Sequence, residues 1–109
     1  MKNLKEVILM IQVELINSHS EDYEMLIRAK GHAGYAHKGN DIVCAAVSVL
    51  LEHTTQNLTS VRVNDDGDNY FATVFNVDEG DKRLIRALGN TLASIASQYP
   101  DNLKLIATR

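Results

Sequence analysis

Two residues of this chain have the side chains that covalent peptide chemistry needs, the single cysteine, Cys44, and a preceding histidine, His32. A thiolate is a strong nucleophile and an imidazole titrates near neutral pH, so the pair meets the minimum requirement for cysteine catalysis. His32 lies in a glycine-rich segment, residues 31–40, that folds back toward Cys44 if it forms a loop. His37 lies on the same segment, and its spacing leaves it open as a competing base. His19, in a predicted hairpin turn, is another competing base.

The apolar run that follows predicts a helix over residues 41–56, with Asp41 at its N-cap. Cys44 would then occupy the first turn, where unpaired N–H groups and the helix dipole favour a thiolate. Asp41 has two readings, as a cap or as a group that orients the imidazole. Ser48 follows Cys44 by one turn and is a weaker site candidate, since its hydroxyl can also bond to its own helix. His53 lies about 13 Å along the helix axis from Cys44, which makes it a poor partner.

The glycines of the segment, Gly31, Gly34 and Gly39, predict a mobile substrate loop. Glycine permits the backbone conformations that a close approach to a peptide requires. We expect this loop to open for an extended peptide and to close over it.

The elements that position these residues follow from hydrophobic periodicity. Strand one alternates with Ile11, Val13 and Leu15 on one face. The helix over 41–56 is apolar on nearly all sides, which predicts a place in the middle of the core. A second helix carries one apolar stripe and ends at Pro100, the only proline. The stripe comprises Leu84, Ile85, Leu88, Leu92, Ile95, Ala96 and Tyr99.

The predicted order is ββαββαβ, with strands over 7–16, 23–30, 58–64, 70–77 and 103–107 and helices over 41–56 and 82–98. On strand four, Phe71, Thr73, Phe75 and Val77 share one face. Short connections make hairpins of the first two and the next two strands. The fold class is therefore α+β, a two-layer sandwich of a mainly antiparallel sheet and two helices, in one domain over residues 1–109.

Composition narrows the class of protein. The chain has 109 residues, a net charge of -3 and no long basic run, so we expect no direct nucleic-acid partner. Its longest apolar run is too short to span a bilayer, so no membrane partner is expected. One cysteine excludes an intramolecular disulfide and fits a cytoplasmic location.

A family resemblance is carried by the middle of the chain, which reads GHAGYA and then GNDIVCAAVS. This segment resembles the signature of the ribosomal-processing cysteine proteases, the small bacterial enzymes called Prp. A Met-Ile-x-Val strand beginning at Met10, the Gln98-Tyr99-Pro100 helix end and Lys104 in the last strand extend the likeness to the C-terminus. Residues 1–9 depart from the pattern and form a candidate extra N-terminal segment.

The resemblance implies a function. Enzymes of this family remove a short N-terminal extension from a large-subunit ribosomal protein, and some phages use the activity on capsid-related proteins. The family's His–Cys dyad carries over to His32 and Cys44. The resemblance also implies a homodimer and a mobile loop, without cofactor or metal.

Other classes remain as alternatives. A non-enzymatic dimeric binding or assembly module of ribosome or phage proteins would keep the fold and hold an inert thiol at Cys44. A metal site would draw on His32, His37, Cys44 and His53, but their spacing forms no tight ligand pair. A redox thiol needs a resolving cysteine from another subunit. Serine hydrolysis is disfavoured because no Gly-x-Ser-x-Gly elbow appears.

Overall fold

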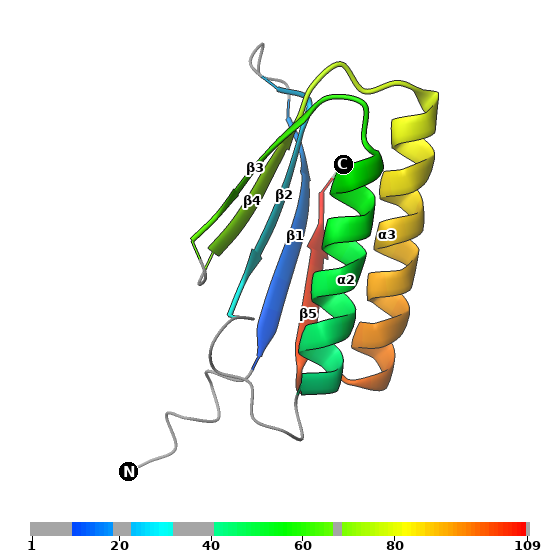
Figure 1. Ribbon diagram of the computed structural model, residues 1–109. Helices are drawn as coiled ribbons and strands as arrows, with labels where there is room; N and C mark the ends of the chain where they lie inside the picture. The colour runs from blue at the N-terminus through cyan, green and yellow to red at the C-terminus, as the bar shows by residue number, and fades with distance from the viewer. Residues whose placement is uncertain (1–9, 19–22, 32–40, 67–68, 109) are drawn as a thin grey trace.

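The order of elements in the computed structural model is the predicted ββαββαβ (Figure 1). The structure describes residues 10–18, 23–31, 41–66 and 69–108. The elements are β1 (Ile11–Asn17), β2 (Met25–Lys30), α2 (Asp41–Asn57), β3 (Val61–Asp65), β4 (Asn69–Val74), α3 (Glu79–Gln98) and β5 (Leu103–Ala107). The last strand has the predicted bounds, and α2 extends one residue beyond them.

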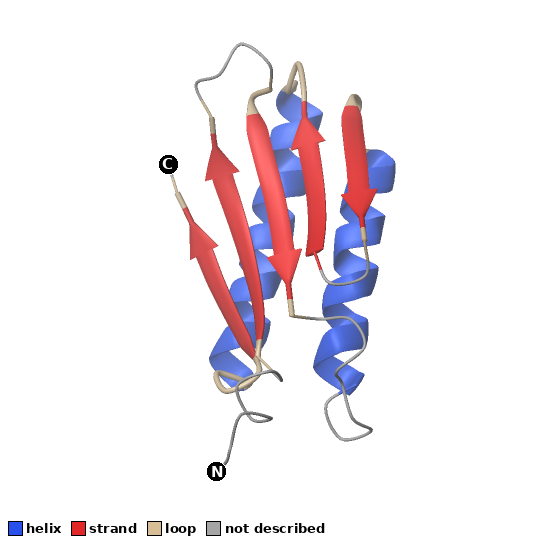
Figure 2. Cartoon of the chain, turned by 90° about the vertical axis from the view of Figure 1, so that its left-hand side faces the viewer, coloured by secondary structure: helices blue, strands red, loops and turns tan. Residues whose placement is uncertain are grey.

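The five strands form one mixed sheet in the order β3-β4-β2-β1-β5. Both predicted hairpins are antiparallel pairs, and β2 also pairs antiparallel with β4. Only β5 runs parallel to its neighbour, β1. Both helices lie behind the sheet in Figure 2, so they cover one of its faces. The architecture is the expected two-layer α+β sandwich.

The core lies between the sheet and the helices. Ile11, Val13 and Leu15 are buried there, as the alternation of β1 predicts. On β2, Ile27 and Ala29 face the same way and are fully buried. Burial of these side chains removes apolar surface from water and holds the two layers together.

The outer face of α2 contradicts the expectation of a helix buried on all sides. Val43, Val47 and Leu51 are buried against the sheet, but Ile42 is 69% exposed and Val49 63% exposed. In a two-layer fold a helix has neighbours on its inner side only, so its outer face meets solvent. The prediction that α2 lies in the middle of the core, made from its apolar composition, was therefore wrong.

Strands β3 and β4 are shorter than predicted. β3 begins at Val61 instead of Leu58, because the Leu58 N–H turns back to the Thr55 carbonyl at 3.4 Å while the Leu58 side chain stays in the core. β4 ends at Val74, and Asn76 then adopts a positive φ of 49° that breaks the extended conformation. The buried face of β4 comprises Tyr70, Ala72 and Val74.

Helix α3 begins at Glu79, three residues before the predicted start, because a capping box forms there. Asp78 accepts from the Asp81 N–H at 2.8 Å, and Asp81 accepts from the Asp78 N–H at 3.1 Å. Ile85, Leu88 and Leu92 are buried as predicted. Tyr99 is 42% exposed, so its placement in the apolar stripe was wrong. It follows the last helical residue, where the regular spacing of the helix no longer applies.

Gly31 marks the point where the chain leaves β2. Its φ is +84°, and a Cβ there would lie 2.6 Å from the Met10 carbonyl oxygen. Only glycine adopts this conformation readily and tolerates this approach. The chain therefore turns sharply at the end of the sheet at which α2 begins (Figure 1).

Candidate active site

Cys44 lies in the first turn of α2, as predicted. It is half-buried and packs beside the hydrophobic core. The first N–H groups of a helix have no acceptor within that helix, and they carry the positive end of its dipole. The sulfur therefore belongs to the end of α2 at which these N–H groups and the positive end of the dipole lie.

Most of the other predicted site residues lie outside the described residues. These are His32, Gly34 and Gly39, together with the competing bases His19 and His37. Asp41 is the first residue of α2, but its side chain is not described, so its role as cap or orienting group stays a prediction. Gly31 is described, and its backbone fixes where the segment containing His32 departs from the sheet.

His53 does not approach Cys44. It is exposed and lies about two and a half helical turns beyond the cysteine, which places the two side chains on opposite sides of α2. The helix geometry therefore agrees with the prediction that His53 is a poor partner for the thiol.

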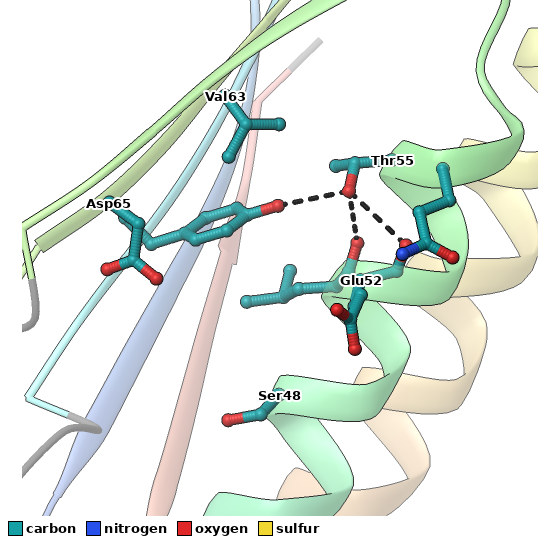
Figure 3. A pocket seen from close by; sticks show the side chains of 8 residues that line it. Ser48, Glu52, Thr55, Val63 and Asp65 are labelled. Atoms are coloured by element: carbon teal, nitrogen blue, oxygen red, sulfur yellow. Dashed lines mark hydrogen bonds between the residues drawn. The ribbon is translucent and has the colours of Figure 1, made fainter.

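A cavity of about 410 Å³ begins one helical turn after Cys44, between α2 and the edge of the sheet. We name it the α2–β3 pocket. Figure 3 shows Ser48 and Glu52 on the helix side and Val63 and Asp65 on the strand side. The complete lining is Ser48, Leu51, Glu52, Thr55, Gln56, Val63, Asp65 and Tyr70.

A chain of hydrogen bonds holds the inner wall of this pocket (Figure 3). The Tyr70 hydroxyl donates to Thr55 Oγ1 at 3.2 Å, and the Thr55 hydroxyl donates to the Leu51 carbonyl at 2.9 Å. Burial raises the pKa of Tyr70, and the negative charges of Asp65 and Glu52 raise it further, against the lowering effect of the Thr55 hydrogen bond. The pocket therefore combines a fixed aromatic wall with a negative electrostatic potential.

Comparison with known protein families identifies the family of this chain. Residues 10–104 match the model of the cysteine protease Prp family. The chain belongs to the Prp cysteine protease family. The match includes the whole predicted signature from Gly31 to Ser48, and it makes this Prp-family chain a cysteine-type endopeptidase, a hydrolase.

Solved structures of similar fold agree with the family. The essential ribosomal processing protease Prp from S. aureus in complex with a substrate peptide has a TM-score of 0.74 at 23% identity, over 91% of this chain and all of that one (100%). Its complex with a covalently linked product peptide has a TM-score of 0.71 at 24% identity, over 91% and 100% of the two chains. SMU.848 from Streptococcus mutans has a TM-score of 0.73 at 24% identity, over 91% and 97%. No curated protein matched the sequence.

Membership in the Prp family favours the enzyme over the binding-module alternative.

Within residues 10–18, 23–31, 41–66 and 69–108, no group of three histidine, cysteine or acidic residues could hold a metal ion. In the same ranges no helix is long and apolar enough to cross a membrane.

Sequence reasoning found Ser48 but missed the rest of the pocket. The helical spacing from Cys44 to Ser48 continues to Glu52 and Thr55, so this part of the lining was open to prediction. Val63, Asp65 and Tyr70 come from the β3–β4 hairpin, and only the position of that hairpin against α2 brings them to the pocket. No local pattern in the sequence specifies where the β3–β4 hairpin packs against α2.

Proposed function

We propose that this chain removes the N-terminal extension of a large-subunit ribosomal protein, with Cys44 as nucleophile and His32 as general base. The family match over residues 10–104 carries the proposal, because it includes both residues in one signature. The position of Cys44 in the first turn of α2 supports it independently. The S. aureus relative, a ribosomal processing protease with a bound substrate peptide, supports the class of substrate.

In the proposed reaction, His32 takes the proton of the Cys44 thiol, and Sγ attacks the scissile carbonyl carbon. The electron pair of the C=O bond moves to oxygen, and N–H groups of the first turn of α2 stabilise the resulting oxyanion. The C–N bond then breaks as the protonated imidazole donates its proton to the leaving amine. Water, deprotonated by the same imidazole, attacks the thioester, and the C–S bond breaks to release the acid and restore the thiol.

Asp41 and Ser48 have supporting roles in this proposal. Asp41 caps α2 or orients the imidazole, and Ser48 contacts substrate one turn beyond the nucleophile. Gly31, Gly34 and Gly39 give the loop the backbone freedom to close over an extended peptide. Residues 1–109 act as one protease domain, in the cytoplasm and as a homodimer, with neither cofactor nor metal.

Mass spectrometry of the ribosomal protein precursor after incubation with the enzyme tests the proposal. We expect one internal cut by the wild type and none by Cys44→Ala or His32→Ala. His53→Ala is the matched control and should cut as the wild type does, because His53 faces away from Cys44. Cutting that survives Cys44→Ala would overturn the assignment of the nucleophile. A folded wild type that cuts neither this precursor nor a phage capsid-related protein, and whose Cys44 reacts slowly with iodoacetamide, would overturn the function.

A further inference from the structure

We propose that the α2–β3 pocket is a substrate subsite that selects a basic side chain, lysine or arginine, through the carboxylates of Glu52 and Asp65. The inference rests on the proposed protease function and adds a specificity to it. A volume of about 410 Å³ lies within the range of roughly 300–1,000 Å³ that is usual for small-ligand sites.

The charge of the pocket argues for a cationic occupant. Its lining contains two carboxylates, Glu52 from α2 and Asp65 from β3, and among the described lining residues none is basic. Glu52 lies on the helix side of the pocket and Asp65 on the strand side (Figure 3). Both charges act on the Tyr70 hydroxyl, so their negative potential extends to the inner wall. Both charges would therefore attract a cationic group that enters the pocket.

The apolar part of the lining suits the stem of a long basic side chain. Leu51 is 2% exposed and Tyr70 8% exposed, whereas Val63 is 45% exposed. Lysine and arginine bury their methylene groups along such surfaces while their charged ends reach polar partners. The hydrogen bond from Tyr70 to Thr55 fixes the aromatic wall before a ligand arrives.

The position of the pocket relative to Cys44 predicts which substrate residue enters it. Glu52 lies two helical turns after Cys44, about 12 Å along the helix axis. An extended peptide advances about 3.3 Å per residue. We consider a peptide that runs along α2 from the nucleophile. At this rise per residue, roughly the third to fifth residue from the scissile bond would lie over the pocket.

A metal ion is a weaker candidate than a basic side chain. Ca²⁺ takes about six to eight oxygen ligands, and Mg²⁺ takes about six in near-octahedral geometry. The pocket offers two carboxylates, and no third histidine, cysteine or acidic residue joins them within the described ranges. A single ammonium or guanidinium group requires only the two carboxylates.

The test uses synthetic peptides that span the cleaved junction of the ribosomal precursor. At each of the five positions on either side of the scissile bond, lysine is compared with norleucine, which has a similar stem and no charge. We expect lysine to raise kcat/KM by about three- to tenfold at one position, the third to fifth on one side. The preference should decline as salt is added, because solvent screens exposed charges.

Charge-neutralising variants assign the preference to the pocket. In Glu52→Gln/Asp65→Asn the advantage of lysine should disappear, so that the lysine and norleucine peptides are cut with equal kcat/KM. Glu79→Gln/Asp101→Asn is the matched control, because it also removes two negative charges and both residues are exposed outside the pocket. Equal cutting of lysine and norleucine peptides at every position would overturn the subsite. An undiminished lysine preference in the double variant would also overturn it.

A binding measurement separates this inference from the proposed function. If no peptide or precursor is cut, the protease function fails, and the same labelled peptides are titrated onto Cys44→Ala by fluorescence polarisation. Tighter binding of the lysine peptide that is lost when Glu52→Gln/Asp65→Asn is added would support the basic subsite without catalysis. Equal binding of both peptides would overturn the subsite.

Discussion

The hydroxyl of Tyr70 donates a hydrogen bond of 3.2 Å to Thr55 Oγ1 and thereby joins β4 to α2. Both residues are buried, and Thr55 passes the interaction on to the helix backbone at the Leu51 carbonyl. The bond lies on the inner wall of the α2–β3 pocket. It therefore fixes the distance between the helix that carries Cys44 and the hairpin that forms the opposite side of the pocket.

Tyr70→Phe removes this bond and keeps the ring. We expect the free energy of unfolding to fall by about 1 kcal/mol, the usual net value of a buried hydrogen bond. Urea denaturation at pH 7 measures the change. Tyr99→Phe is the matched control and should leave stability unchanged, because Tyr99 is 42% exposed. A Tyr70→Phe variant as stable as the wild type would show that the bond makes no net contribution to stability.

Tyr70 also predicts a loss of stability in alkaline solution. Its pKa is raised by burial and by the charges of Asp65 and Glu52, whereas in the unfolded chain a tyrosine titrates near its ordinary value of about 10. Above that pH the unfolded state releases the proton more readily, so the stability present below about pH 10 declines as pH rises. Denaturation of wild type and Tyr70→Phe at pH 8 and 10.5 should show a smaller decline in the variant. Parallel declines would contradict this assignment.

For Asp81 we expect the opposite pH dependence, a loss of stability in acid. Burial alone would raise its pKa, but hydrogen bonds from Thr59 and Asp78 outweigh burial and lower the pKa below its usual value. The carboxylate is 1% exposed and accepts from the Thr59 N–H at 2.9 Å. The stability that it contributes is present above about pH 4 and is lost as pH falls through the lowered pKa.

Asp81→Asn should therefore cost about 1–3 kcal/mol at pH 7, because an amide NH₂ replaces one of the two accepting oxygens. The cost should shrink as pH falls toward 3, where the wild type loses its own contribution. Urea denaturation between pH 7 and 3 tests both statements. Asp101→Asn, at an exposed turn residue, is the control for charge loss. A pH-independent cost would mean that the lowered pKa does not contribute to stability.

Local patterns predicted most of the fold. The alternation of Ile11, Val13 and Leu15 gave the buried face of β1, and the stripe of α3 gave its buried side at Ile85, Leu88 and Leu92. Element ends were less accurate, because they depend on particular hydrogen bonds. Asp78 and Asp81 form a capping box that starts α3 earlier than its apolar residues indicate. The spacing of these two acids, three residues apart before an apolar stripe, is a local signal for that earlier start.

Non-local contacts were beyond sequence reasoning. β1 lies between β2 and β5, and no local signal specifies that β5 pairs parallel to β1. The same holds for the α2–β3 pocket, where Ser48 meets residues of a hairpin formed later in the chain. Cys44 was predictable because helix position and residue type are both local properties.

Gly31→Ala gives the last prediction, at the residue from which the segment containing His32 leaves the sheet. The new Cβ would lie 2.6 Å from the Met10 carbonyl oxygen at a φ of +84°, so both the contact and the backbone conformation are unfavourable. We expect a loss of about 1–3 kcal/mol in the free energy of unfolding. We also expect slower precursor cleavage at temperatures where the variant is folded, because a shift at Gly31 moves the start of the segment that contains His32. Urea denaturation and the mass-spectrometric cleavage assay measure the two effects. Gly80→Ala is the control, since its Cβ would contact only the Asp78 side chain at 3.4 Å. Unchanged stability in Gly31→Ala would show that Met10 moves aside without cost, and unchanged cleavage in a destabilised variant would separate this turn from the active site.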